Sequence, residues 1–258
     1  MLSFLVPLLV LSVTFVPLER MFALRRQQRV LRPGWRTDIL HFFVNPLIEV
    51  GATIVVLAPV VVLGIVVVPD QLQELVATQP DWLEAFEAFA IVVVGTYWGH
   101  RFAHQVPFLW RFHRVHHSSP QLDWMAAVHL HPFDQAFTRF LPVIPLVALG
   151  FSGATLGGVV VVLQLLAILE HANVRWSFGP LRWVLPNPQW HHWHHSAEAH
   201  DSNYSGIPFV DAIFGTAHFP STSGRRATAS TNRCRGATSA SSPHPSGRRR
   251  RARRPTPA

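Results

Sequence analysis

The chain has 258 residues, of which 49% are hydrophobic and only 14% are charged. A soluble domain carries about 25% charged residues, so this deficit favours a membrane protein. All 22 basic residues are arginine, and ten of them follow Pro220, where no acid occurs. The high pI therefore belongs to the tail and is poor support for nucleic-acid binding. The single cysteine excludes an internal disulfide framework and a cysteine-based metal site.

Four apolar stretches, taken in chain order, predict helices that cross a membrane. About 20 apolar residues are needed to span hydrocarbon about 30 Å thick. Residues 2–18, 42–68 and 82–99 each predict one span, and residues 140–169 predict a helical hairpin broken by a Gly-Phe-Ser-Gly turn. A signal peptide is the alternative for the first stretch, but arginines follow that stretch instead of preceding it and no small-residue cleavage site appears.

The arginines also predict how the chain is oriented. Six of them follow the first apolar stretch, between residues 20 and 36, and such loops stay on the cytoplasmic side. The third span and the hairpin then both end on that side, together with the histidine-rich segments after them. We therefore expect an all-α integral membrane protein with four to five transmembrane helices, an outside N-terminus and a cytoplasmic histidine-rich helical cap.

Three regions follow from this reading. Residues 1–99 are expected to hold transmembrane helices 1–3, and residues 100–220 a histidine-rich catalytic region that includes the hairpin. Residues 221–258 lack apolar periodicity and have two interpretations. One is a disordered basic tail attracted to anionic lipid headgroups. The other is a frameshift product, because GC-rich codons for residues 220–234, read one frame over, encode an ordinary globular sequence containing Tyr-Gly-Ile-Asp.

Sixteen histidines are the main anomaly of the composition, and fourteen of them lie from His100 to His218. They form an H-x-x-x-H pair, an H-x-x-H-H group, a histidine after the hairpin and a second H-x-x-H-H group, which are His100 and His104; His113, His116 and His117; His171; and His191, His194 and His195. On a helix, positions i, i+3 and i+4 share a face, so each group can direct its rings to one place.

Nine imidazoles are too many for one ion and suit two. Imidazole binds Fe, Zn, Cu and Ni, and a structural zinc takes about four ligands. Two redox metals with open positions could bind and split oxygen. His129 and His131 either complete the metal shell or orient ligands together with Asp134. Glu170 and Asp123 likewise have two possible roles, as carboxylates that bridge the metals or as hydrogen-bond acceptors for the ligands.

The ordered motifs resemble the fatty acid hydroxylase superfamily, which includes sterol desaturases and alkylglycerol monooxygenase. The resemblance covers residues 97–216 and rests on Tyr97-Trp98-x-His100-Arg101-x-x-His104, Leu109-Trp110-x-x-His113-x-x-His116-His117-Ser118, His131-Pro132, His171-x-Asn173, His191-x-x-His194-His195, Asn203-Tyr204 and Phe214-Gly215-Thr216. It implies a helical membrane fold, two nonheme iron ions, O2 as co-substrate and an external electron donor. The family pattern continues with Tyr-Gly-Ile-Asp, which the shifted reading of the tail restores.

The resemblance also implies a ligand set by matching motif. The implied metal ligands are His100, His104, His113, His116, His117, His171, His191, His194 and His195. Some relatives have a further histidine four places after the one matching His171; that place is Arg175 here, and His131 is the candidate substitute.

The expected function is O2-dependent hydroxylation or desaturation of a lipid C–H bond. No NAD, flavin or haem motif appears, so electrons are expected from a partner protein. A metal transporter would place its ligands near the bilayer midplane, and an intramembrane metalloprotease would need H-E-x-x-H. A noncatalytic metal-binding or metal-transporting membrane protein is the alternative.

Overall fold

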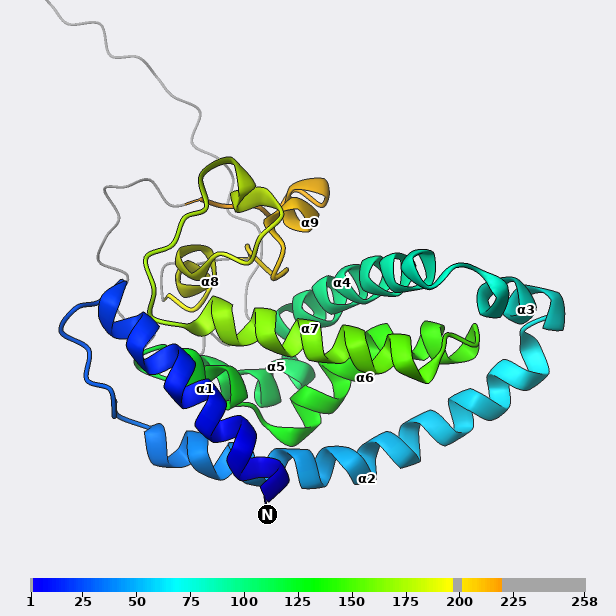
Figure 1. The fold of residues 1–258 in the computed structure, drawn as a ribbon, viewed down its shortest axis with the longest axis horizontal. Coiled ribbons are helices and arrows are strands. Elements are labelled where there is room, and N and C mark those ends of the chain that lie inside the picture. The colour runs from blue at the N-terminus through cyan, green and yellow to red at the C-terminus, as the bar shows by residue number, and fades with distance from the viewer. Residues whose placement is uncertain (1, 197–200, 220–258) are drawn as a thin grey trace, which may run out of the picture.

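The computed structural model describes residues 2–196 and 201–219, and these two ranges contain helices and loops but no β-strand (Figure 1). The α-helices are α1 (Leu2–Met21), α2 (Trp35–Val67), α3 (Asp70–Thr78), α4 (Asp81–Gln105), α5 (Pro107–His113), α6 (Pro132–Ala148), α7 (Gly153–His171), α8 (Pro188–His194) and α9 (Pro208–Ile213). Three 3-10 helices join them: η1 (His116–Ser118), η2 (Trp124–Val128) and η3 (Gly179–Trp183). The all-helical prediction is confirmed, and the predicted tail lies outside the described residues.

Helices α2, α4, α6 and α7 run along the long axis of the molecule, and α3 joins α2 to α4 at one end (Figure 1). Helix α6 packs against both α2 and α4, and α7 packs against α4. A Cβ added to Gly95 of α4 would lie 2.5 Å from Cβ of Pro142 in α6. Only glycine therefore lets these two backbones approach so closely, and the paired helices deliver the end of α4 to the histidine region.

The predicted hairpin is present as α6 and α7. The break between the two helices lies at the predicted Gly-Phe-Ser-Gly turn. Gly150 adopts a positive φ of 80° there, and Ser152 caps α7 by accepting a hydrogen bond from the Thr155 amide at 3.2 Å. Helix α6 begins at Pro132, eight residues earlier than the predicted apolar arm. Proline is favoured at the first helical position and His131 caps the helix, so local capping sets the start.

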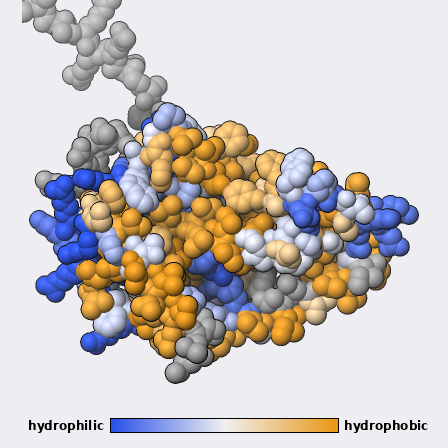
Figure 2. All heavy atoms as spheres, viewed as in Figure 1, coloured by the Kyte–Doolittle hydropathy of each residue, from blue (hydrophilic) through white to orange (hydrophobic). Residues whose placement is uncertain are grey.

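The surface of the long helices is apolar. Large hydrophobic side chains are exposed along α2, among them Leu47, Ile54, Val62 and Val66. Figure 2 shows apolar residues over most of the visible face, with hydrophilic residues gathered at both ends of the long axis. Among the described residues, α1 and α7 are long and apolar enough to cross a membrane. The count of four to five spans and the cytoplasmic side of the cap stay predictions.

The end of α1 is tied to the histidine region. The Glu19 carboxylate accepts hydrogen bonds from the amides of Trp124 at 2.7 Å and Asn173 at 2.9 Å. The Arg175 amide donates to the carbonyl of Phe22 at 2.9 Å. Because Asn173 lies two residues after the end of α7, these contacts hold that end against α1.

The short elements form a helical cap at the end of the molecule where α4 and α7 finish (Figure 1). Helices α5, α8 and α9 each begin with a proline, whose missing amide and fixed φ suit the first helical position. The loop before α9 is held by Asp211, which accepts hydrogen bonds from the amides of Tyr204 at 2.8 Å and Ser205 at 2.7 Å and from the Thr216 hydroxyl at 2.7 Å.

Candidate metal centre

Four segments far apart in the chain bring nine histidine rings together inside the cap. Helix α4 supplies its last turn, α7 supplies its last residue, and the remaining rings come from the α5–η1 segment and from α8. The rings form two clusters, and within each cluster the atoms that could bind a metal all lie within 4.8 Å of one another. The first group is His100, His104, His113, His117 and His194; the second group is His116, His171, His191 and His195.

Each H-x-x-H-H motif is divided between the two groups. In both motifs the first and last histidines go to one group, and the histidine between them goes to the other. Thus His191 and His195 belong to the second group while His194 belongs to the first. At the end of α8, His194 and His195 are about 100° apart around the helix axis, so they point to different groups. His113 instead ends α5, whereas His116 and His117 lie in η1, so the first motif does not lie on one helix. Neither motif gathers its three rings in one group.

A shared hydrogen-bonding pattern orients most of the rings. In five of the nine, Nδ1 hydrogen-bonds to a carbonyl or carboxylate oxygen, so Nδ1 donates and carries the proton. The acceptors of His100, His113, His116, His171 and His194 are, in that order, the Tyr204 carbonyl at 2.6 Å, Asp134 at 3.1 Å, the His129 carbonyl at 3.3 Å, the Ala167 carbonyl at 2.7 Å and the Ser202 carbonyl at 2.8 Å. Their Nε2 lone pairs then point into the groups.

The inward nitrogens crowd together in a way that neutral rings alone do not explain. Nε2 of His100 lies 3.1 Å from Nε2 of both His113 and His194, and Nε2 of His171 lies 3.1 Å from that of His116 and 3.0 Å from that of His191. In three of these four contacts both rings already donate through Nδ1, so two lone pairs face each other. A cation placed between them would turn this repulsion into ligation.

Two further atoms in the groups lack a protein partner. Nε2 of His104 and Nε2 of His117, both in the first group, are buried and have no hydrogen-bond partner among the described residues. A buried polar atom without a partner is costly, so its presence calls for a ligand or water. The donor set therefore fits metal ions at both groups.

Burial keeps these rings neutral. The pKa is depressed first by burial and then by neighbouring imidazoles, and it lies well below the ordinary value for His116, His117, His191 and His195. Burial likewise lowers the pKa of His194 to about 3. Neutral imidazole is the form that binds metal, so at neutral pH these rings are ready to act as ligands.

Two carboxylates support the rings from outside the groups. Asp134 faces Nδ1 of His113 through both oxygens, each at 3.1 Å, and Glu170 faces Nδ1 of His191. A carboxylate behind a ligating histidine fixes the ring and raises its basicity. Neither Glu170 nor Asp123 belongs to a group, although the sequence allowed both to be bridging ligands. Asp123 instead pairs with Arg32 at 2.8 Å.

His129, His131 and His192 lie outside both groups. Nδ1 of His131 accepts a hydrogen bond from the Phe133 amide at 3.1 Å and caps α6, which is a structural role. Nδ1 of His129 pairs with Asp38 at 2.5 Å. His192 is buried, and its Nε2 lies 2.9 Å from the carbonyl of His171. His131 as an additional ligand is therefore not supported by its position.

Sequence reasoning missed the buried polar residues that approach from the loop before α2. Arg32 and Asp38 are fully buried and form an ion pair of 2.6 Å. In the sequence they look like ordinary members of an arginine-rich loop and a helix start. An acid in the first turn of a helix is common, because it lies near the positive end of the helix dipole, so the position of Asp38 gave no signal of its burial.

The chain is similar to known proteins over its histidine-rich region. The family model described as fatty acid hydroxylase matches residues 85–216. Ornithine lipid hydroxylase OlsE of Rhizobium tropici is 34% identical over 148 residues, which are 55% of this chain and 45% of that protein. Alkylglycerol monooxygenase of Danio rerio is 35% identical over 132 residues, covering 50% of this chain and 29% of the relative.

A very-long-chain aldehyde decarbonylase, GL1-6 of Oryza sativa subsp. indica, is 32% identical over 133 residues, covering 46% of this chain and 20% of that protein. The matched part of the chain thus spans less than half the length of these relatives. No solved structure matches the chain. The shared region contains every histidine of the two groups.

Proposed function

Because the chain belongs to the fatty acid hydroxylase family, we propose that it is a membrane-bound, O2-dependent oxidoreductase with two nonheme iron ions that hydroxylates or desaturates a lipid C–H bond. The observation that carries this proposal is the pair of histidine groups inside the cap that share no ring. The first group would hold one ion and the second group the other.

The spacing of the nitrogens supports one ion in each group. Two nitrogens bound to the same ion at about 2.1 Å lie about 3.0–3.4 Å apart, depending on the angle between them. The inward Nε2 contacts measure 3.0–3.1 Å. Five histidines of the first group and four of the second would hold the ions, and imidazole ligands suit iron. Iron bound here would supply the oxygen chemistry that side chains lack.

The protein side chains and backbone would hold and orient the histidine rings and shield the metal site from water. Asp134 and the four backbone carbonyls keep the Nδ1 proton on the outer side of five rings, so each of their Nε2 lone pairs stays available. The rings of the second group are all buried. Such a dry site limits side reactions with water and favours an apolar substrate.

The reaction balance requires an external reductant. Hydroxylation converts a C–H bond, O2, two electrons and two protons into an alcohol and water; desaturation converts two neighbouring C–H bonds with the same inputs into an alkene and two waters. An electron-donor protein is therefore the proposed partner. The substrate is proposed to be a lipid, sterol or fatty acyl in class, entering from the bilayer alongside the apolar helices.

Metal content and oxygen use test the proposal. Full-length protein in detergent, loaded with Fe²⁺ without air, is expected to bind two irons per chain by mass spectrometry. Oxygen consumption should require both reductant and lipid extract, and the product should gain one oxygen or lose two hydrogens. Iron binding without oxygen consumption would instead favour the noncatalytic metal-binding alternative, and movement of metal across vesicles would favour transport.

A further inference from the structure

A buried ion-pair network joins the start of α2 to the loop after η1. The Arg32 guanidinium, with no exposed surface, pairs with Asp38 through Nη2 at 2.6 Å and with Asp123 through Nε at 2.8 Å. It also donates through Nη1 to the Ser119 hydroxyl at 3.0 Å. Two carboxylates around one arginine leave the network with one negative charge in excess, and the second oxygen of Asp38 is free for another donor.

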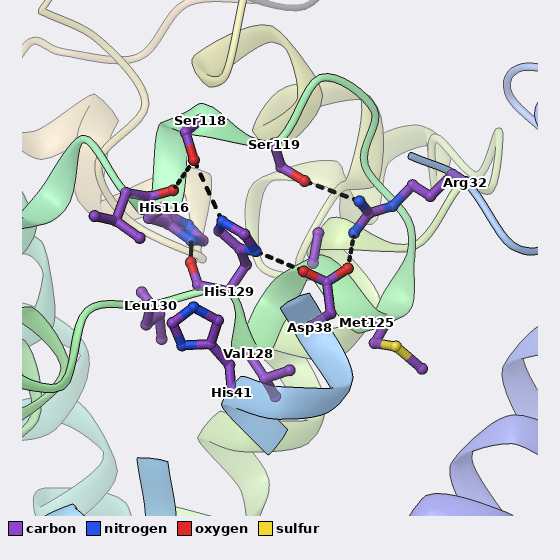
Figure 3. Close-up of polar contacts among 12 residues, drawn as sticks. Arg32, Asp38, His41, His116, Ser118, Ser119, Met125, Val128, His129 and Leu130 are labelled. Carbon is purple, nitrogen blue, oxygen red and sulfur yellow. Dashed lines mark hydrogen bonds and ion pairs between the residues drawn. The ribbon is translucent and has the colours of Figure 1, made fainter. Parts of the chain in front are cut away.

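That donor is His129, the residue after η2. Its Nδ1 lies 2.5 Å from Oδ1 of Asp38, and its Nε2 lies 3.3 Å from the hydroxyl of Ser118. Its carbonyl accepts the hydrogen bond from Nδ1 of His116 at 3.3 Å. Figure 3 shows His129 between Asp38 and Ser118, with Arg32 on the other side of Asp38. One residue thus contacts the network by its side chain and a second-group ring by its backbone.

The geometry assigns Asp38 and His129 as a positioning pair that sets the ring of His116 for metal binding in the second group. This inference rests on the proposed function, since it concerns how tightly that group holds its ion. Nδ1 of His116 donates to the His129 carbonyl, and this hydrogen bond is long at 3.3 Å. Its direction therefore depends on how firmly His129 itself is held.

Two side chains hold the ring of His129 in place. The Asp38 carboxylate contacts the ring from the α2 side, and Ser118 contacts it from the turn that carries His116. The backbone is also held, because the His129 amide donates to the Ala126 carbonyl at 3.0 Å. Without Asp38 the ring loses its carboxylate partner, and we expect the His129 carbonyl to shift relative to His116. Losing an outer partner of a metal ligand typically lowers metal affinity about 10–100-fold.

Two matched variants separate positioning from general charge loss. Asp38→Asn and Asp123→Asn each remove one of the two negative charges that pair with Arg32, but only Asp38 contacts His129. Asparagine and aspartate are about equally good N-cap residues, so Asp123→Asn is expected to keep the N-cap of η2. In Co²⁺ titrations of the full-length protein followed by absorption spectroscopy, Asp38→Asn is expected to weaken one of two sites about 10–100-fold. Asp123→Asn is expected to leave both sites at the wild-type affinity.

A second variant keeps the test decisive if Asp38→Asn does not fold. His129→Leu leaves both ion pairs of Arg32 intact and is expected to weaken the same site. In a His191→Ala background, which disables the second group, neither substitution should change the remaining site. The positioning role would be overturned if both Asp38→Asn and His129→Leu kept the wild-type metal affinity, or if Asp123→Asn lost as much affinity as Asp38→Asn. It would also be overturned if either substitution lowered the affinity of the remaining site in the His191→Ala background. If the wild-type protein itself binds no metal, the proposed function fails instead, which is a distinct result.

Discussion

Neighbouring histidines of equal burial have different surroundings in α8. His191 and His192 are each 4% exposed, yet only His191 directs Nε2 toward the second group. The ring of His192 turns about 100° away along the helix and contacts the carbonyl of His171. Residue type and burial therefore do not distinguish a member of a histidine group from its neighbour here; the direction of the ring does.

Alanine substitution of these two histidines gives a residue-scale prediction. His191→Ala removes one of four second-group rings and is expected to reduce bound iron from two ions per chain toward one. His192→Ala is expected to retain both ions, because its ring belongs to neither group. Metal analysis of the purified variants checks this. Equal iron loss in the two proteins would contradict the assignment of the second group.

The spacing of histidines predicted which rings would gather but not how they are shared. All nine rings implied by the motifs lie in the two groups, and no ring outside that set joins them within the described residues. The division of each H-x-x-H-H motif between groups was not predictable, because it depends on where the segments from α4 and α7 approach. The Asp38–His129 contact was also hidden, since its members are 91 positions apart.

At the scale of elements, helix contact depends on small residues placed where two backbones meet. Gly95 of α4 faces Pro142 of α6, and a Cβ there would also lie 2.7 Å from the Pro142 Cα. Gly157 of α7 has nothing within 4 Å of an added Cβ. Both are glycines inside apolar helices, so the sequence pattern does not tell them apart.

Gly95→Ala is expected to lower the free energy of unfolding by about 1–3 kcal/mol, because the added methyl group overpacks the α4–α6 contact. Gly157→Ala serves as the control and is expected to be neutral or stabilising by up to about 1 kcal/mol, since alanine favours helix more than glycine does. Unfolding of each variant in detergent micelles measures the difference. Equal stability of the two variants would show that the α4–α6 contact is looser than described.

At the scale of the whole molecule, polarity is arranged along the long axis. The arginine-rich loop before α2 and the cap lie toward one end, and α3 lies at the other, with apolar surface between them (Figures 1 and 2). Helix α2 has 33 residues and at about 1.5 Å per residue is longer than the hydrocarbon layer. This arrangement suits a membrane whose surfaces meet the two polar ends.

Single cysteines test that arrangement. In a Cys234→Ser background, cysteines replacing the exposed residues Val30 and Ala77 are expected to react with an impermeant thiol reagent from opposite sides of the membrane. Val30 should label only after the cytoplasmic face is opened, as the excess of arginines predicts. Labelling of both positions from one side would mean that α2 does not cross the bilayer.

The sequence by itself determined the all-helical class, the break between α6 and α7 and the identity of the nine rings, because apolar runs, glycines and histidine spacing act over a few neighbouring residues. Only the tertiary structure decided how the rings divide into two groups, which carboxylates stand behind them and how Arg32 and Asp38 reach His129. Those features depend on contacts between segments distant in the chain, and such contacts form only when helix packing brings buried polar groups to the partners they require.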